Sequence, residues 1–573
     1  MDAALDLDTA GLRKARGAFF TPQPVAEYVT RWAVRQASDR VLEPSCGEAA
    51  FLLAALERQT ALAADGDSSQ RGDLAGVELH AASAKSARQY LRAAGAGEVD
   101  VCGGDFFAVE PSATFDAVIG NPPYIRYQDF SGLSRTASRA AALRAGVSLT
   151  GLASSWAAFT VHSALFLKDG GRLGLVLPAE LLSVNYAAQV REFLMRRFGR
   201  VRLVLFTERV FPGVLEEVVL LLAEGTGGTD HCELLQVHGA DDLSDLDAGH
   251  ESTWTPATTS GKWTSALLPA AAAAPYAHVV TGAGFTTLDA WGDTTLGMVT
   301  GANSFFALSP ARARSLGLTK EELLPLSPPG SRHLRGLSFT STMRTALGEA
   351  DARTLLFRPS GRPSAAGAAY IAQGEAQEVH LAYKCQVRTP WWRVPLLAPA
   401  DLLLTYMNSD TARLTTNTAG ARHLNSVHGV YLHPDARDVG RRLLPLASLN
   451  SATLLGAEVV GRAYGGGMLK LEPREADHLP VPSPAQVEAV GPQLTAVRDK
   501  VTARLRAGRL LDAVRLVDQV LLADGLGVDR AQLAALQEAY VVLAQRRRAR
   551  GAGPKDRAAL NDRTPGVGGG RRA

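Results

Sequence analysis

Short apolar runs alternate with amphipathic segments along the first part of the chain. Four apolar runs, at residues 41–43, 74–78, 99–103 and 115–119, are bounded by glycine, proline and polar residues, which is typical of short buried strands. Helical spacing lies between them. Strands that alternate with helices predict an α/β fold with a mainly parallel sheet.

The same alternation continues to about residue 224. We predict a helix near 156–167, a strand at 172–177, a helix at 184–198 and strands at 201–206 and 217–223.

The first predicted helix begins beside Thr21. Thr21 is predicted as its N-cap and Pro22 as its first helical residue, because Val25, Val29 and Trp32 follow at helical spacing. A helix N-terminus with free N–H groups suits a carboxylate ligand.

Each of the first four predicted strands ends in an acid or an amide. These residues are Glu43, Glu78, Asp105 and Asn121. Glu43 leads into a tight loop that contains Gly47 and precedes a helix, an arrangement found around nucleoside-bearing cofactors. Ligands of open α/β sheets bind at the carboxyl ends of the strands, so these side chains outline a candidate site.

The loop Asn121-Pro122-Pro123-Tyr124 carries the most specific chemistry. Two prolines stop the preceding strand, and they leave carbonyl groups without competing backbone donors. The Asn121 side-chain oxygen and the Pro122 carbonyl could each accept one N–H of an amino group on a planar ring, and Tyr124 could stack on that ring. A plain turn with an exposed tyrosine is the alternative interpretation of this tetrapeptide alone.

Composition places the chain among globular proteins. It has 573 residues, of which 46% are hydrophobic, and a net charge of +3, which by itself does not imply nucleic-acid binding. Four scattered cysteines without paired spacing argue against a zinc site and against disulfides, and favour a reducing cytoplasm. No signal peptide and no apolar run of about 18 residues is found, so we expect no membrane association.

The composition changes after residue 225. Residues 225–284 are rich in Gly, Thr, Ser and Asp, and mixed β segments with arginine and aromatic residues follow from 289. We predict the following division: 1–250 catalytic domain, 251–288 linker, 289–485 recognition domain, 486–550 C-terminal helices and 551–573 disordered basic tail.

The ordered set of motifs resembles the S-adenosylmethionine-dependent N6-adenine DNA methyltransferases of the gamma arrangement. The motifs are Thr21-Pro22, Glu43-Pro44-Ser45-Cys46-Gly47, Gly76-Val77-Glu78, Gly104-Asp105-Phe106 and Asn121-Pro122-Pro123-Tyr124. The resemblance implies a Rossmann-like sheet of about seven strands, followed by a mixed α+β target-recognition domain and a C-terminal helical segment. Ala49 departs from the family pattern, which more often has a second glycine there.

The resemblance also assigns roles. It implies that Thr21, Glu43, Pro44, Cys46 and Gly47 hold the methionine part of S-adenosylmethionine, that Glu78 binds the ribose, and that Asp105 with Phe106 holds the adenine. Asn121 and Pro122 would grip the target amino group, while Tyr124 and Phe211 would stack on the extruded base. No metal is required.

Double-stranded DNA is the expected partner. A separate restriction endonuclease, other defence-system subunits such as those of a phage-exclusion system, and an orphan role all stay open from the sequence. Arginine, asparagine and aromatic residues suit groove and phosphate contacts, and our candidates are Arg126, Asn303, Arg393, Arg462 and Tyr464.

Other functions stay open from the sequence. A protein glutamine methyltransferase can carry the same tetrapeptide, because a side-chain amide also presents an NH₂ group. An N4-cytosine methyltransferase is chemically close, although asparagine at position 121 counts against it. A DNA-specificity subunit without catalysis is the alternative from another class.

Overall fold

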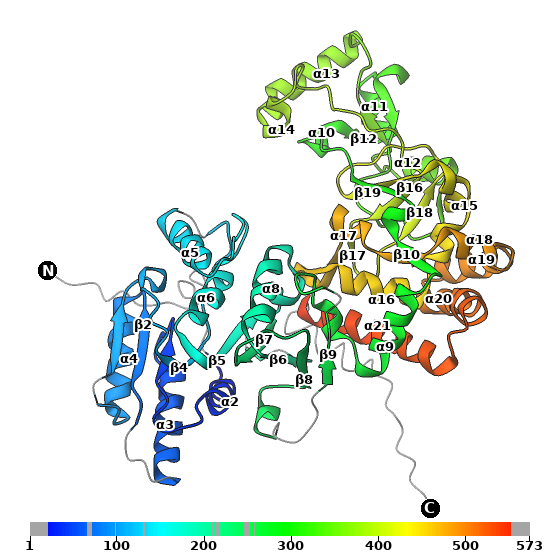
Figure 1. Cartoon of the computed structure of the whole chain (residues 1–573). Coiled ribbons are helices and arrows are strands. Elements are labelled where there is room, and N and C mark those ends of the chain that lie inside the picture. Colours follow the sequence, from blue (N-terminus) through cyan, green and yellow to red (C-terminus); the bar gives the residue numbers. More distant parts are fainter. Residues whose placement is uncertain are drawn as a thin grey trace, which may run out of the picture. The chain divides into compact units, whose positions relative to one another are not determined.

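The computed structural model describes residues 21–65, 71–97, 99–129, 132–208, 210–211, 217–245, 252–256 and 258–551. The chain divides into two compact units, Met1–Leu267 and Leu268–Ala573 (Figure 1). This division falls within residues 251–288, which the sequence predicts as a linker. The predicted tail lies outside the described residues from position 552 on.

The first unit is built on a nine-stranded sheet with the order β3-β2-β1-β4-β5-β7-β6-β8-β9. The strands are β1 (Val41–Glu43), β2 (Leu74–Glu78), β3 (Asp100–Gly103), β4 (Phe115–Gly120), β5 (Leu167–Pro178), β6 (Arg200–Phe206), β7 (Val218–Glu224), β8 (Cys232–Val237) and β9 (Ser252–Trp254). The first five strands are parallel, whereas β7 runs antiparallel to β5 and β6. The predicted α/β class is confirmed, and β8 and β9 extend the sheet beyond the seven strands expected.

The order of the strands reverses between β1 and β4. From β1 the chain adds β2 and β3 on one side, and then β4 and β5 on the other side. Such a switch point opens a crevice at the carboxyl ends of the two central strands. The loops after β1 and β4 therefore border the position where this fold binds ligands.

Helices cover both faces of this sheet. They are α2 (Gln23–Ala33), α3 (Ala50–Asp65) and α4 (Ala81–Ala93) for one hydrophobic cluster, and α5 (Gly132–Arg144), α6 (Ser155–Ala164) and α8 (Ala188–Arg197) for the other. Successive side chains of a strand point to opposite faces. Accordingly Ala117 and Ile119 pack in the first cluster, and Val118 between them packs in the second with the buried Trp156.

The second unit contains a five-stranded sheet with the order β11-β19-β16-β18-β14. These strands are β11 (Gly292–Leu296), β14 (Ser338–Phe339), β16 (Leu402–Thr405), β18 (Leu414–Asn417) and β19 (Val427–Leu432). Helices α9 (Ala270–Thr281), α15 (Arg437–Ala447), α16 (Ser451–Val460), α18 (Pro484–Ala489), α19 (Gly491–Arg506), α20 (Leu510–Asp518) and α21 (Arg530–Gly551) belong to the same unit. A mixed α+β region followed by helices matches the predicted fold class.

Smaller elements complete the second unit. A sheet of β12 (Ala307–Leu308), β15 (Leu355–Phe357) and β13 (Leu323–Pro325) lies with α10 (Asn303–Phe306), α11 (Pro310–Ser315) and α13 (Ala365–Ala376) around a hydrophobic cluster of its own. A second small sheet is formed by β17 (Met407–Asn408), β21 (Met468–Lys470) and β20 (Arg462–Tyr464), and β10 (Phe285–Thr287) pairs with β22 (Pro480–Pro482).

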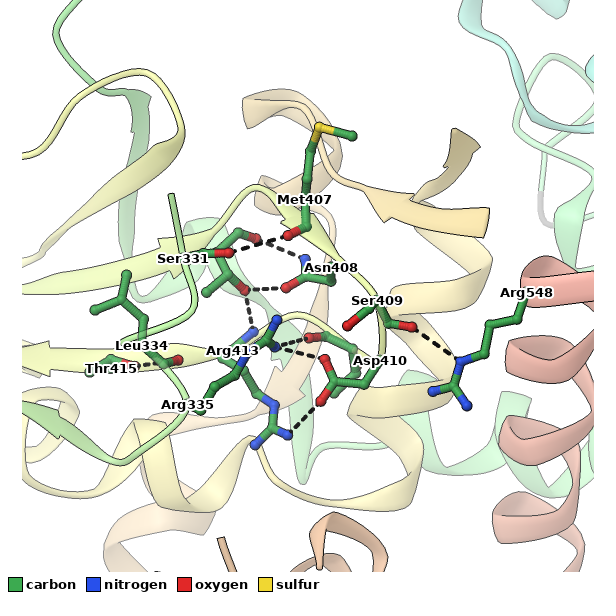
Figure 2. Close-up of polar contacts among 12 residues, drawn as sticks. Ser331, Leu334, Arg335, Met407, Asn408, Ser409, Asp410, Arg413, Thr415 and Arg548 are labelled. Carbon is green, nitrogen blue, oxygen red and sulfur yellow. Dashed lines mark hydrogen bonds and ion pairs between the residues drawn. The ribbon is translucent and has the colours of Figure 1, made fainter. Parts of the chain in front are cut away.

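Figure 2 shows how the turn between β17 and β18 is held. The Asp410 carboxylate accepts from Arg335 at 2.7 Å and from Arg413 at 2.9 Å, one guanidinium on each oxygen. Arg548 of α21 donates to the carbonyl of Ser409 at 3.1 Å. The last long helix of the chain thus contacts the loops of this unit directly.

Arg547, the preceding residue of α21, forms a buried ion pair. It is 2% exposed and donates twice to the Glu458 carboxylate of α16, at 2.9 and 2.7 Å. Its guanidinium also donates to the carbonyls of Gly467 and Asp410. These contacts tie α21 to the turn between β20 and β21.

The structure also bears on disulfides, metal sites and membrane-spanning helices. The four cysteines are free. Within the described ranges, no group of three or more His, Cys, Asp or Glu side chains could hold a metal ion. No single helix among the described residues is long and apolar enough to cross a membrane. The segments Pro434–Ala447 and Ser451–Val460, bent by 90° relative to each other, reach that length and apolar composition only when they are taken together.

Candidate active site

The loop after β4 is tied to the start of helix α6. The Ser155 hydroxyl donates to the Pro123 carbonyl and accepts from the Ile125 N–H at 2.9 Å, while the Ser155 N–H donates to the Ile125 carbonyl at 3.1 Å. One serine at the first turn of the helix thus fixes the backbone on both sides of Tyr124. Ser155 is not among the residues predicted from the sequence, although a Ser154-Ser155 pair before an apolar helix is a helix-start signal.

The Asn121 side chain is held at both ends of its amide. Its Nδ2 donates to Thr21 Oγ1 at 3.2 Å, and its Oδ1 accepts from the Tyr124 hydroxyl at 2.8 Å. The same hydroxyl lies 3.0 Å from the Val176 carbonyl at the end of β5. Three residues predicted from the sequence, Thr21, Asn121 and Tyr124, are therefore connected in one chain of hydrogen bonds.

Thr21 does not cap helix α2, so that prediction is wrong. The helix begins at Gln23, its N-cap position is Pro22 with φ −56° and ψ 138°, and no side chain caps it. Pro22 has the extended conformation of an N-cap residue, so it takes the position predicted for Thr21. The Thr21 hydroxyl oxygen accepts from Asn121 instead.

The loops after β1 and β2 are joined through Glu78. The Glu78 carboxylate, 6% exposed, accepts from the Gly47 N–H at 2.9 Å and from the His80 N–H at 2.8 Å. The Cys46 N–H donates to the Val77 carbonyl at 2.9 Å. Gly47 has φ +51°, a left-handed conformation that glycine adopts at little cost, and it lets the loop turn towards Glu78.

Glu43 is buried at the base of the same loop. Its Oε2 accepts from the Leu52 N–H of α3 at 3.2 Å. Burial raises the pKa of Glu43 well above its ordinary value, and the negative charge of Glu78 raises it further. Burial likewise raises the pKa of the Cys46 thiol, so this cysteine is kept neutral.

Ala49 has a conformation that favours glycine. It has φ +70°, and its side chain is fully buried in the hydrophobic cluster with α2 and α3. A left-handed conformation costs a residue with a Cβ about 1–2 kcal/mol. A glycine, which is more usual at this position in the family, would adopt this conformation at little cost.

Asp105 and Phe106 differ in their accessibility. Asp105 Oδ1 caps the short helix Phe106–Ala108 by accepting from the Phe107 N–H at 3.0 Å. Phe106 is 2% exposed, and its ring stacks on Phe159 with centroids 5.5 Å apart and 13° between the planes. The acid lies at the sheet edge, whereas the aromatic ring packs in the core behind it.

Comparison with known proteins identifies the family. Residues 8–230 match the family model described as N-6 DNA Methylase, and residues 260–522 match the model of the C-terminal domain of the type II methyltransferase M.Eco57I. The chain belongs to the N6-adenine DNA methyltransferases of type II restriction–modification.

Full-length relatives agree. The type II methyltransferase M.XamI of Xanthomonas campestris pv. amaranthicola is 27% identical over 487 residues, which cover 83% of this chain and 87% of that protein. The type II methyltransferase M.AccI of Acinetobacter calcoaceticus is 23% identical over 471 residues, covering 81% and 84%. The predicted resemblance and the adenine-specific DNA methyltransferase activity are confirmed, and a glutamine methyltransferase or a non-catalytic subunit is not favoured.

A polar cluster lies beside the loop after β4 of this methyltransferase. Glu180, the first residue of α7 (Glu180–Ser183), accepts from the Tyr186 hydroxyl at 2.6 Å and from the Trp156 Nε1–H at 3.3 Å. Tyr186 also contacts Ser154 at 3.1 Å. Burial and the neighbouring carboxylate raise the pKa of Tyr186. This cluster is not predictable from the sequence, because its members become neighbours only through the fold.

Phe211 is the second aromatic residue predicted for the methyltransferase site. It is 4% exposed and belongs to the hydrophobic cluster against which Tyr124 packs. Residues 212–216, which follow it, lie outside the described residues.

The predicted DNA contacts lie in both units of the methyltransferase. Arg126 is exposed and lies two residues after Tyr124. In the second unit Asn303 accepts from Thr300 Oγ1 at 2.5 Å, and Arg393 lies over the Trp392 ring at 5.8 Å. Arg462 pairs with Glu475 at 2.8 Å; Tyr464 is 56% exposed, and the Lys470 ammonium lies 5.0 Å from its ring centroid.

Proposed function

We propose that this methyltransferase moves the methyl group of S-adenosylmethionine to N6 of an adenine turned out of duplex DNA. The observation that carries the proposal is the hydrogen-bonded chain Thr21–Asn121–Tyr124 at the switch point of the sheet. It holds an amide oxygen in a fixed direction beside the rigid Pro122. N6 is then aligned for direct displacement at a sulfonium methyl group, which S-adenosylmethionine supplies.

The residues of the adjoining loops fit this cofactor chemically. Each Glu78 oxygen accepts one backbone N–H and keeps a second lone pair, so the carboxylate can accept from ribose hydroxyls as well. Asp105 keeps acceptor capacity beside its capping bond for an adenine amino group. We assign the methionine end to Thr21 and to the loop from Glu43 through Pro44 and Cys46 to Gly47, and Phe106 to the support of the adenine pocket.

Asn121 and Pro122 would lower the barrier by accepting hydrogen bonds from the target amino group. The N6 lone pair is conjugated with the ring, and two acceptors on its hydrogens favour a more tetrahedral nitrogen. Their hydrogen bonds strengthen as positive charge develops on N6, so they stabilise the transition state more than the bound substrate. The methylated nitrogen then releases one proton to solvent.

Extrusion of the adenine costs a few kcal/mol, about the scale of one good stacking contact. We propose that Tyr124 stacks on one face of the extruded base and Phe211 on the other. The second unit would read the target sequence, with Asn303, Arg393, Arg462 and Tyr464 as candidate contacts and Arg126 near the catalytic loop. A separate restriction endonuclease of the same specificity would share the cytoplasm with this enzyme.

Replacement of Asn121 by alanine tests the mechanism. We expect the single-turnover rate of methyl transfer to duplex DNA to fall at least about 100-fold, as for removal of one transition-state hydrogen bond elsewhere. Cofactor binding should persist. The Asn121 side chain bonds to Thr21 and Tyr124, whereas the hydrogen bond between Gly47 and Glu78, which joins the two cofactor loops, does not involve Asn121.

Asn185→Ala is a matched control, since Asn185 is an exposed asparagine in the same unit. The control should methylate DNA as the wild type does. Near-normal turnover of the Asn121→Ala variant would refute the assigned role, and methylation of a protein in place of DNA would refute the function. Methylation-sensitive sequencing of host DNA would identify the target site for these assays.

A further inference from the structure

Arg358 of the second unit lies against the segment of residues 392–398, which carries Arg393. Arg358 directly follows β15, and its Nε donates to the Val394 carbonyl at 2.8 Å while Nη1 donates to the Pro359 carbonyl at 2.6 Å. Arg393 precedes Val394 and lies over the Trp392 ring. The half-buried Arg358 is therefore anchored by backbone carbonyls, with its charge next to the exposed Arg393.

A third arginine, Arg422, lies in the loop between β18 and β19, and its charge acts on Arg358. The Arg422 N–H donates to the Pro325 carbonyl at 2.9 Å, and the Ser327 N–H donates to the Arg422 carbonyl at 2.8 Å. This backbone pairing fixes Arg422 at the carboxyl end of β13, where Pro325 pairs with Leu355 of β15. Arg422 Nε is buried and has no hydrogen-bond partner in the part of the chain that the structure describes.

The charges of Arg393 and Arg422 both act on Arg358. Burial lowers the pKa of Arg358, and the positive charges of Arg393 and Arg422 lower it further. No ion pair joins any of them to a carboxylate within the described ranges. Asp401, near the same segment in sequence, is engaged by Arg437 at 2.9 Å and Arg441 at 2.8 Å. Positive charge is thus concentrated here without an anion to offset it.

The surrounding sequence has the same excess. Residues 301–400 contain twelve Lys and Arg against six Asp and Glu, whereas the whole chain carries a net charge of only +3. Keeping like charges together in a half-buried place is unfavourable unless a ligand of opposite charge binds. Guanidinium groups match the geometry of phosphate oxygens and bind them in a bidentate manner.

We propose that Arg358, Arg393 and Arg422 form a phosphate-binding cluster that takes a backbone phosphate of the duplex DNA. This inference rests on the proposed function, because it assumes that DNA lies against the second unit. The cluster fixes the position of the duplex and reads no base, since phosphates carry no sequence information directly. Trp392, half-buried below Arg393, keeps that side chain at the surface of the cluster.

The salt dependence of DNA binding tests the cluster. In the double variant Arg393→Gln/Arg422→Gln, the slope of log K against log salt concentration should become shallower by about 1 to 2, since each lost phosphate contact removes about 0.9. The affinity at low salt should fall about tenfold or more, and the KM for DNA should rise. The loss should be the same for duplexes with and without the target site.

Arg314→Gln/Arg362→Gln is the matched control, because it removes the same charge from exposed positions of the same unit that have no ion pair among the described residues. Equal slopes in the two double variants, or an unchanged slope in the cluster variant, would overturn the proposal. Cofactor titration and circular dichroism confirm that each variant is folded. Arg358 is left intact in this test, because its backbone hydrogen bonds also support the fold.

A titration with inorganic phosphate distinguishes the two sources of this ligand chemistry. If phosphate binds the cluster of the wild type but DNA affinity does not depend on Arg393 and Arg422, the site serves a small anion and the DNA proposal is wrong. Methylation of DNA by the wild type, measured in parallel, separates failure of the cluster from failure of the proposed function.

Discussion

Replacing Tyr124 by phenylalanine separates two contributions of that side chain. Its hydroxyl donates to Asn121 Oδ1 at 2.8 Å and lies 3.0 Å from the Val176 carbonyl, whereas its ring packs against both hydrophobic clusters of the first unit. A neutral hydrogen bond contributes about 0.5–1.5 kcal/mol net. At 1.36 kcal/mol for each factor of ten in rate, its loss predicts a decrease of about 2- to 12-fold in methyl transfer.

Tyr124→Ala removes the ring as well. Stacking of a base on an aromatic side chain is worth about 1–3 kcal/mol, so we expect a further decrease of about 5- to 150-fold relative to Tyr124→Phe. Single-turnover transfer of a labelled methyl group to a duplex with one target site measures both effects. A 2-aminopurine in place of the target adenine reports extrusion, which Tyr124→Phe should leave intact and Tyr124→Ala should reduce.

The double variant Asn121→Ala/Tyr124→Phe tests whether the hydroxyl acts through Asn121. If it orients the amide, its removal costs nothing more once the amide is gone, and the two effects are strongly non-additive. Additive losses would show that the hydroxyl contacts the substrate by another route. A loss of more than about 100-fold in Tyr124→Phe alone would refute the assignment of one ordinary hydrogen bond.

The local part of the site could be predicted from the sequence. Glu43, Glu78 and Asn121 follow short apolar runs that become β1, β2 and β4, and a strand with buried faces leaves a recognisable pattern of residues. Parallel pairing then brings the carboxyl ends of these strands to one edge. The positions of these side chains thus depend on patterns within about ten residues of each.

The remainder depends on contacts between distant segments. Thr21 binds Asn121 100 residues away, and Ser155 holds a loop that lies 30 residues before it. Neither pair has a spacing that a single sequence reveals, and the Thr21 prediction failed because the capping pattern was present without the capping contact. The same limit applies to the arginine cluster, whose three members come from three loops.

The remaining predictions concern stability. Arg547→Met should destabilise the second unit by about 3–5 kcal/mol in urea unfolding, because it leaves the Glu458 carboxylate, 4% exposed, without its counter-ion. The double variant Arg547→Met/Glu458→Met should recover most of that loss. A double variant as unstable as Arg547→Met would contradict the pairing. His423 concerns acid stability: both ring nitrogens are buried without partners among the described residues, and burial, followed by the charge of His428, lowers its pKa to about 4. Since the unfolded side chain titrates near about 6.5, the unfolded state binds the proton first as the pH falls. The contribution of His423 to the free energy of unfolding is therefore fully present above about pH 6.5. It declines as the pH falls to about 4, by at most about 1.4 kcal/mol per pH unit. The His423→Leu variant should be at least as stable as the wild type at neutral pH. Between about pH 6.5 and 4.5 it should lose about 2 kcal/mol less of its free energy of unfolding than the wild type. An unchanged pH profile of urea midpoints would exclude His423 as a source of the acid sensitivity.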